Sequence, residues 1–348
     1  MIPVFDGHND VLLRLYRAGI EGAERRFLDG EAAGHLDLPR AREGGFVGGL
    51  FALYAPSRSG LNYRALSGEA YALPLPAEVP LDEARTIILG MASILLRIVR
   101  ASEGAVALCR TVAEIRAAMA RGALAAVMHV EGAEAIDPNL AMLDVLHAAG
   151  LRSLGPVWSR DNIFGAGVPM RYPSSPDIGG GLTEAGRRLV RRCNELKILV
   201  DLSHLTEQGF WDVVRLTDAP LVATHSNVHA LCASSRNLTD RQLDAIRASD
   251  GIVGVNFATS FLRADGQMRA DTPLDDVVRH LDGLIERVGE TRVGLGSDYD
   301  GAVVPRDLAS AAHLPRLFEA LSARGYDDAL LTRIGHENWL RVLERTIG

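Results

Sequence analysis

The sequence predicts an α/β protein, a (β/α)8 barrel of the TIM type that forms a single domain over residues 1–348. Short apolar runs alternate with longer segments of helical periodicity along the chain, which favours parallel strands joined by helices. Several runs, such as 198–200 and 252–255, are almost continuously apolar, as in strands buried on both faces. Eight runs in a chain of this length favour a closed barrel over an open sheet.

Eight segments are predicted to be the barrel strands. In chain order they are residues 4–10, 46–55, 124–132, 153–159, 198–204, 221–225, 252–257 and 293–298. An open doubly wound sheet is the alternative, but it usually carries a glycine-rich phosphate-binding turn after its first strand. Here the first strand ends in Asp6-Gly7-His8-Asn9-Asp10, so that fingerprint is absent.

Helices are predicted between the strands from apolar residues at helical spacing. They cover residues 81–102, 111–121, 140–149, 183–196, 207–216, 240–249, 274–288 and 308–324, and one or two closing helices cover 327–346. Thr111 and Glu114 are spaced as a capping box, and Gly150 is a suitable C-cap. The longest irregular stretch, 56–80, is a candidate lid or interface loop.

Composition narrows the functional classes. The chain is 47% hydrophobic and 23% charged, with a net charge of −7 and no basic tract, so nucleic-acid and anionic-membrane surfaces are not expected. No apolar run is long enough to span a bilayer, and neither a signal peptide nor a lipid-anchor motif is apparent. Three widely spaced cysteines are expected to be buried thiols of a reduced, cytoplasmic protein.

Ionisable side chains follow five of the predicted strands. They are His8, Asp10, Glu131, His204, His225 and Asp298. Taken singly, each has an ordinary explanation as a hydrogen-bonded residue or a helix cap. Together they would place three imidazoles and three carboxylates at the carboxyl rim, where barrel enzymes have their active sites. Such a cluster is costly to desolvate unless one or two divalent ions neutralise it.

Histidine and carboxylate ligands without thiolates suit zinc, manganese or cobalt. Two ions about 3.5–4 Å apart need a bridging group, and Glu131 is the best placed. Some barrel hydrolases bridge their metals with a carbamylated lysine. The only lysine here, Lys197, precedes the fifth strand and so lies at the wrong end.

Seven motifs in the same order resemble the renal (membrane) dipeptidase family of binuclear zinc metallopeptidases, within the amidohydrolase-like barrels. They are Asp6-Gly7-His8-Asn9-Asp10, Val130-Glu131-Gly132, Ser203-His204-Leu205, Thr224-His225-Ser226-Asn227, Ser235-Arg236-Asn237, Gly296-Ser297-Asp298-Tyr299-Asp300-Gly301 and Asn338-Trp339-Leu340-Arg341-Val342. The set spans nearly the whole chain and is specific as an ordered series.

The resemblance implies a role for each metal ligand. His8 and Asp10 would hold one ion, His204 and His225 the other, and Glu131 would bridge the two. A hydroxide between the ions would be the nucleophile, because two Lewis acids lower its pKa. Zinc is the expected metal.

The resemblance also implies three supporting roles. Asp298 would take the proton of the nucleophile and pass it to the leaving amine. Arg236 would bind the C-terminal carboxylate of the substrate with its bidentate fork. Asp6 would orient the imidazole of His8.

Two positions depart from the family pattern at sites that touch substrate. Trp158 stands where the family has a histidine after the fourth strand, and Ala258 stands where it has an aromatic residue. Arg160, with Asn162, is a candidate to take over the lost polar contact. Trp158 and Arg160 are therefore predicted substrate-binding residues alongside Arg236.

The predicted function is that of a metal-dependent dipeptidase acting on dipeptides with a free C-terminal carboxylate, including D-residues at that position. Another small amide, such as an N-acyl amino acid or a β-lactam, hydrolysed at the same binuclear site is the alternative. A barrel that serves only as a binding module would be expected to have lost ligands, and none is missing. A homodimer is a further possibility.

Overall fold

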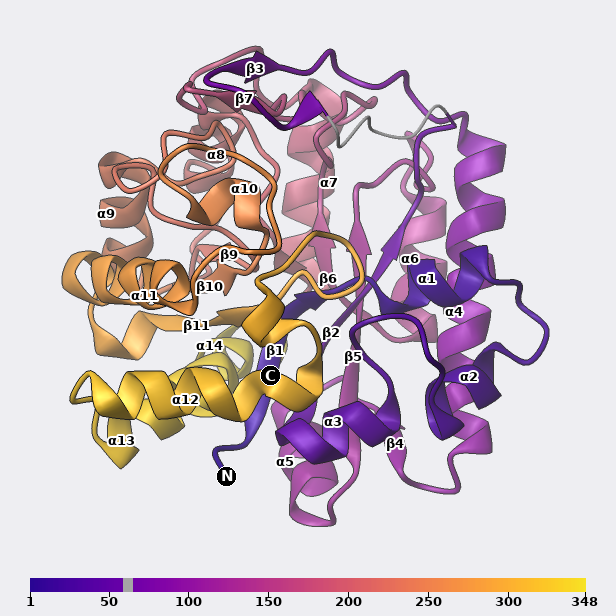
Figure 1. The fold of residues 1–348 in the computed structure, drawn as a ribbon. Helices are drawn as coiled ribbons and strands as arrows, with labels where there is room; N and C mark the ends of the chain where they lie inside the picture. The colour runs from indigo at the N-terminus through magenta and orange to yellow at the C-terminus, as the bar shows by residue number, and fades with distance from the viewer. Residues whose placement is uncertain (59–64) are drawn as a thin grey trace.

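A computed structural model of the chain describes residues 1–58 and 65–348. Within this part, eight parallel strands form the predicted barrel (Figure 1). They are β1 (Val4–Asn9), β2 (Phe46–Tyr54), β5 (Leu124–Glu131), β6 (Leu151–Gly155), β8 (Leu199–Val200), β9 (Val222–Ala223), β10 (Ile252–Asn256) and β11 (Val293–Gly296). The predicted fold class and all eight expected strands are confirmed.

The strands follow one another around the ring in chain order. Hydrogen bonds run from β9 through β10, β11, β1, β2, β5 and β6 to β8. The last gap, between β8 and β9, is spanned by a parallel bridge of Asp201 with Val222 and by the Leu202 N–H, which donates to the Val222 carbonyl at 2.9 Å. The ring is therefore nearly closed, and all the carboxyl ends face the same side.

Helices surround the strands (Figure 1). They are α1 (Val11–Arg17), α2 (Ala23–Asp29), α3 (Leu38–Gly44), α4 (Leu81–Ala101), α5 (Val112–Ala120), α6 (Ala141–Ala149), α7 (Glu184–Glu195), α8 (Glu207–Val214), α9 (Asp240–Ala248), α10 (Thr259–Leu262), α11 (Leu274–Val288), α12 (Leu314–Ala323), α13 (Asp328–Thr332) and α14 (Asn338–Thr346). Thr111 caps α5 as expected by accepting the Glu114 N–H at 3.2 Å. Helices α1 to α3, which follow the first strand, were not predicted.

Several predicted boundaries were wrong. The fifth and sixth strands have only two residues each, because the Asp201 carboxylate accepts the N–H groups of Ser203 and Thr224 and replaces the ladder. The helix expected over 308–324 begins at Leu314, since Pro315 in its first turn cannot continue a helix from upstream. The closing segment is interrupted by a π-helical turn at Arg333–Glu337.

The segment 56–80 is only partly irregular. Its residues 59–64 lie outside the described part of the chain, so for them a lid or interface loop stays a prediction. Strand β3 (Tyr71–Ala72) pairs antiparallel with β7 (Arg171–Tyr172), and the two lie together at the top of Figure 1. Within the described residues, no helix has the length and apolar character needed to cross a membrane.

At the amino end of its strands, the barrel interior is filled by a residue of the last helix. Trp339 of α14 is fully buried in a cluster with residues from six of the ring strands. Its ring occupies the space that a Cβ would need at Gly7, Gly254 and Gly294, on three adjacent strands. The indole N–H donates to the Leu295 carbonyl at 3.0 Å. The lower barrel is thus closed by packing, and the polar cluster occupies the opposite end.

Candidate metal centre

The structure brings the six predicted strand-end residues together at the carboxyl rim. His8 lies in β1, Glu131 is the last residue of β5, and Asp10 immediately precedes α1. His204 and His225 lie in the turns that follow β8 and β9. All five of these side chains are buried, whereas Asp298, two residues beyond β11, is partly exposed. Their roles as ligands and catalyst remain predictions.

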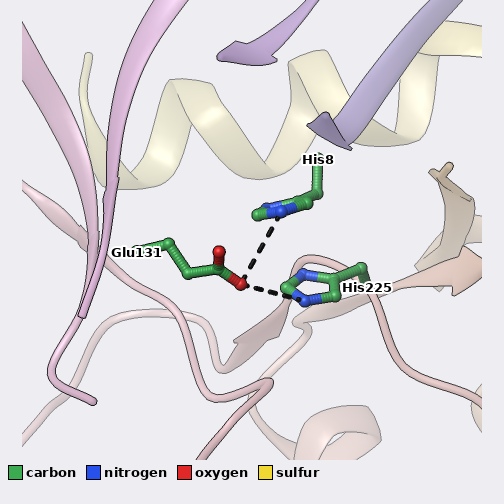
Figure 2. A group of neighbouring side chains, drawn as sticks. All are labelled: His8, Glu131 and His225. Carbon is green, nitrogen blue, oxygen red and sulfur yellow. Dashed lines mark ion pairs between the residues drawn. The ribbon is translucent and has the colours of Figure 1, made fainter. Parts of the chain in front are cut away.

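Glu131 is at the centre of the cluster. Its Oε1 lies 2.9 Å from Nε2 of His204, 3.5 Å from Nε2 of His225 and 3.7 Å from Nε2 of His8. Figure 2 shows that His8 and His225 approach this same oxygen from two different strand ends. One carboxylate oxygen shared by three imidazole nitrogens has the arrangement expected of a bridging ligand.

A second group adjoins the first through His8. Ligand atoms of His8, Asp10 and Asp298 lie within 4.8 Å of one another, as do those of His8, Glu131 and His225. Nε2 of His8 is 3.2 Å from Oδ2 of Asp10. Two neighbouring sets that share a residue provide donors for two ions.

The tautomer of His225 is fixed by hydrogen bonds beneath it. The Thr224 hydroxyl donates to Oδ2 of Asp201 at 2.7 Å, so its single proton is committed. At 2.8 Å from that hydroxyl, Nδ1 of His225 must therefore carry the proton and donate it. This leaves the lone pair of Nε2 directed at Glu131 and available to a metal ion.

His204 is arranged in a similar way. Its Nδ1 lies 2.9 Å from the Ser159 hydroxyl, and its Nε2 accepts from Nη2 of Arg236 at 3.3 Å. The Nε2 atoms of His204 and His225 are only 3.0 Å apart. Burial, with nearby positive charge, lowers the pKa of both imidazoles well below the usual range. Two neutral imidazoles whose lone pairs face each other fit a shared cation, and two nitrogens of a tetrahedral zinc site lie roughly 3.4 Å apart.

The carboxylates also fit a cation. Burial raises the pKa of Glu131 well above its usual value and raises that of Asp298. Burial lowers the pKa of His8, but the charges of Glu131 and Asp10 more than offset this and raise it to about 10. Without an ion, these groups can be stabilised only by sharing protons, whereas a divalent ion would hold all three in their metal-binding forms.

Asp298 is held in an uncommon backbone conformation. Its φ of 58° is in the left-handed region, and Asp300 has a φ of 68°. Such strain persists only where the surroundings enforce it, often at functional sites. Oδ2 of Asp298 accepts the side-chain amide of Asn256 at 3.0 Å, which leaves Oδ1 facing the cluster beside Asp10 and Gly301.

Arg236 lies beside the histidine pair. Its Nη1 donates to the Ser203 carbonyl, and its guanidinium lies 5.4 Å from the ring centre of Phe261. Burial lowers its pKa to about 10, against the attraction of Asp298 and Glu131. Nε has no partner among the described residues. A buried guanidinium with spare donors, next to a cavity, is suited to bind a carboxylate.

A cavity of about 190 Å³ opens above the cluster. Asp10, Glu131, His204, Asp298 and Arg236 all line it, as do Trp158 and Ala258. The Trp158 ring lies 5.7 Å from the His204 ring and 5.0 Å from that of Tyr54, so it forms one wall of the cavity.

The expectation that Arg160 contacts substrate needs correction. Arg160 is fully buried and does not line the cavity. It donates to Glu134 at 2.8 Å, to the Ser57 hydroxyl at 2.7 Å and to the Ala55 carbonyl at 2.9 Å. Because these contacts occupy its donors, Arg160 supports the wall behind Trp158 and Tyr54 and does not face a ligand.

The expectation for Asp6 was also wrong. Its carboxylate accepts the backbone N–H of Ser297 at 2.7 Å and the Ser297 hydroxyl at 2.8 Å. Asp6 was expected to orient the imidazole of His8, but Nδ1 of His8 has no hydrogen-bond partner among the described residues. Asp6 therefore anchors the turn that carries Asp298, and burial raises its own pKa to about 7.

Four residues of the site were not singled out from the sequence. Thr224 and Asp201 orient His225, Asn256 orients Asp298, and Gly301 allows the final turn to approach Asp10. Asn256 is the last residue of β10. It would have been found if uncharged polar residues at strand ends had been considered along with the ionisable ones. Gly301 had no signal beyond its place in the Gly296–Gly301 motif.

Comparison with known proteins identifies relatives over the whole chain. The model of the membrane dipeptidase family, peptidase family M19, matches residues 1–347. An uncharacterized protein in the pqqA 5′ region of Klebsiella pneumoniae is 49% identical over 252 residues, which cover 72% of this chain and 93% of that protein.

Two solved structures superpose closely. A metallopeptidase from Rhodobacter sphaeroides, bound to a phosphinate mimic of the dipeptide L-Ala-D-Ala, is 55% identical with a TM-score of 0.97 over 99% of both chains. The dipeptidase AC, a metallopeptidase of family M19, is also 55% identical with a TM-score of 0.97, over 100% of this chain and 99% of that one.

Proposed function

This chain belongs to the membrane dipeptidase family, peptidase family M19, and from the site described above we propose which of its residues carry out the reaction. The protein is a metal-dependent dipeptidase. The single observation that carries the residue assignment is Glu131, whose one oxygen is shared by three imidazoles on the floor of a cavity that Arg236 and Asp298 also line.

We propose two divalent ions, with zinc as the native metal. His8 and Asp10 would hold one ion, His204 and His225 the other, and Glu131 would bridge them. The ligand set of nitrogen and oxygen donors supports zinc. Bound ions would supply Lewis acidity, which polarises the scissile carbonyl and makes water a better nucleophile.

Asp298 moves the proton. Asn256 occupies Oδ2, so Oδ1 is the atom that takes a proton from the attacking water and passes it to the leaving amine. The raised pKa of this carboxyl suits both halves of the transfer, because it lies nearer to neutrality than that of an ordinary aspartate.

Arg236 fixes the direction in which the substrate binds. Its guanidinium would bind the C-terminal carboxylate, and the neighbouring Phe261 and Ala258 would contact the C-terminal side chain. The mimic of L-Ala-D-Ala bound by the Rhodobacter sphaeroides relative supports acceptance of a D-residue at this position. Trp158 would exclude water from the opposite wall.

The test is a reconstitution. Metal-free protein is loaded with zinc or manganese and assayed against L,L- and L,D-dipeptides, N-acetylated dipeptides and a β-lactam. Hydrolysis of free dipeptides that requires about two ions per chain is expected. Asp298→Asn should abolish turnover and retain both ions, and Arg236→Met should raise KM. Preferential cleavage of the β-lactam or the N-acetylated compounds would overturn the assignment of a dipeptide substrate.

We further propose a cytoplasmic location. Its support is that Cys109, Cys193 and Cys232 are all buried free thiols, as expected in a reducing compartment. Assembly as a homodimer is a separate proposal, and size-exclusion chromatography with light scattering would test it.

A further inference from the structure

One wall of the cavity is a face of helix α1. Asp10, Leu13 and Arg17 all line the cavity, and their spacing of three and four residues places them on one side of the helix. Asp10 stands at the metal cluster, and Arg17 stands about 10 Å further along the axis, at a rise of about 1.5 Å per residue. The wall therefore runs from the metal cluster towards the mouth of the cavity, and the guanidinium of Arg17 stands at its outer end.

The orientation of helical side chains brings Arg17 over the cavity. In an α-helix each Cα–Cβ bond tilts towards the N-terminus, so a long side chain lies over the preceding turn. For Arg17 the preceding turn is that of Leu13, and beyond it lies Asp10. We therefore expect the guanidinium to lean from the mouth of the cavity back towards the cluster.

Arg17 has no ionic partner among the described residues, in contrast to the other arginine of this helix. Arg14 pairs with Glu31 and with Asp300, the latter at 3.2 Å, and donates to the Leu36 carbonyl at 2.7 Å. Arg17 makes no hydrogen bond or ion pair with any residue that the structure describes, and its side chain is exposed. Asp300, another acidic residue that lines the cavity, is therefore already paired with Arg14. The charge of Arg17 is left available to a ligand.

The direction in which the dipeptide lies in the cavity decides which part of it comes close to Arg17. Arg236 lies on the His204 side of the cluster, at 3.3 Å from its Nε2, whereas α1 starts at Asp10 on the His8 side. With the C-terminal carboxylate at Arg236 and the scissile amide at the cluster, the N-terminal residue extends along α1. Its side chain passes Leu13 and points to the rim.

We infer that Arg17 is a specificity-determining residue that favours dipeptides whose N-terminal residue carries a carboxylate side chain, aspartate or glutamate. The inference rests on the proposed function, because Arg236 sets the direction of the substrate. The acidic side chain would place its methylene groups against Leu13 and its carboxylate at the guanidinium. The methylene stem of Arg17 could instead contact an apolar side chain, and the experiment distinguishes these outcomes.

The experiment compares L-Glu-Ala with L-Gln-Ala. In both dipeptides the C-terminal alanine has the configuration that the enzyme cleaves. These substrates have nearly the same shape and differ in one charge. The zinc-loaded wild-type enzyme should show a higher kcat/KM for L-Glu-Ala, and Arg17→Gln should lower the ratio of the two values roughly two- to fivefold, as for an exposed ion pair. Arg17→Lys should keep most of the ratio, and 0.5 M NaCl should reduce it in the wild type.

Arg42→Gln is the matched control, since it removes the same charge from an exposed residue of α3 that does not line the cavity. It should leave the ratio unchanged. An equal ratio in the wild type and Arg17→Gln would overturn the inference, as would a wild-type preference for L-Leu-Ala that Arg17→Gln reduces. Failure to cleave any dipeptide would instead count against the proposed function.

Discussion

At the scale of single residues, the cluster depends on side chains that do not line the cavity. The Asp201 carboxylate is buried and accepts bonds from Ser203 and from Thr224, so both of its oxygens are occupied. Thr224 then has no proton left for His225 and must accept one. Asp201 thus selects, through Thr224, which nitrogen of His225 carries the proton and which faces Glu131 as the predicted metal ligand.

Replacing Thr224 with valine tests this arrangement. The change keeps the shape and removes the hydroxyl, so Nδ1 of His225 and Oδ2 of Asp201 lose their partner. We expect metal affinity to fall by about 10- to 100-fold, measured by competition with a chromophoric chelator. Thr224→Ser should restore it, and wild-type affinity in Thr224→Val would show that the hydroxyl does not orient the ring.

Gly301 illustrates a residue required for its lack of a side chain. A Cβ at this position would fall on the carboxylate oxygens of Asp10 and Asp298. Gly301→Ala should therefore displace a predicted ligand and the predicted proton carrier together, and lower kcat/KM by roughly 100-fold or more. Circular dichroism should show an intact fold.

Gly180→Ala is the control for that variant. The nearest atom to its added Cβ is 3.9 Å away, so activity should be retained. Full activity of Gly301→Ala would mean that the two carboxylates can move without consequence for the reaction.

At the scale of elements, the barrel strands and the last helix pack together because small residues on the strands face a large residue on the helix. Glycines on β1, β10 and β11 leave the space that Trp339 of α14 fills. Long-range packing of this kind joins the two ends of the chain, because β1 starts at Val4 and α14 ends at Thr346. The helix closes the barrel beneath the site.

Truncating Trp339 should destabilise the whole barrel. Removal of a fully buried indole and its hydrogen bond leaves a large cavity, so Trp339→Ala should lower the free energy of unfolding by about 3–5 kcal/mol. Urea titration would measure this loss. Trp211→Ala, at a half-buried position on α8, should cost clearly less.

The glycine partner gives a more specific test of the same packing. Gly294→Ala should be strongly destabilising alone and much less so in the Trp339→Ala background, because the clash is then gone. Additive effects in this double-mutant cycle would show that the two positions do not share space.

At the scale of the whole molecule, closing the ring brings distant strand ends to one point. Asp10 and Asp298 are separated by most of the chain, yet their ligand atoms lie within 4.8 Å. Stability of this assembly is expected to depend on pH through buried groups remote from the cavity. His280 is one of them: its Nδ1 accepts the Val228 N–H at 3.1 Å, and its Nε2 donates to the Leu262 carbonyl at 2.9 Å.

Burial lowers the pKa of His280 from 6.5 to about 4. Between these pH values the unfolded chain binds a proton that the folded chain excludes, so stability is full above pH 6.5 and falls as the pH drops towards 4. The loss from this residue should reach about 2–3 kcal/mol at pH 4.5. His280→Gln should reduce the stability difference between pH 7.5 and 4.5 by that amount in urea titrations.

Asn139→Gln, which changes an exposed residue without a titratable side chain, should leave the pH dependence unchanged. An unaltered pH dependence in His280→Gln would mean that other buried groups dominate the acid lability.

The sequence alone determined the barrel, its eight strands and the six strand-end residues, because burial on both faces and polar residues at strand ends are local patterns. It did not determine where Asp6 and Arg160 direct their polar atoms, because hydrogen-bond partners such as Ser297 and Glu134 are chosen only when the ring closes. Nor did it determine the tautomer of His225, the space around Gly301 or the position of Arg17. Those depend on distances between strands and helices that are far apart in the chain, and the tertiary structure alone sets them.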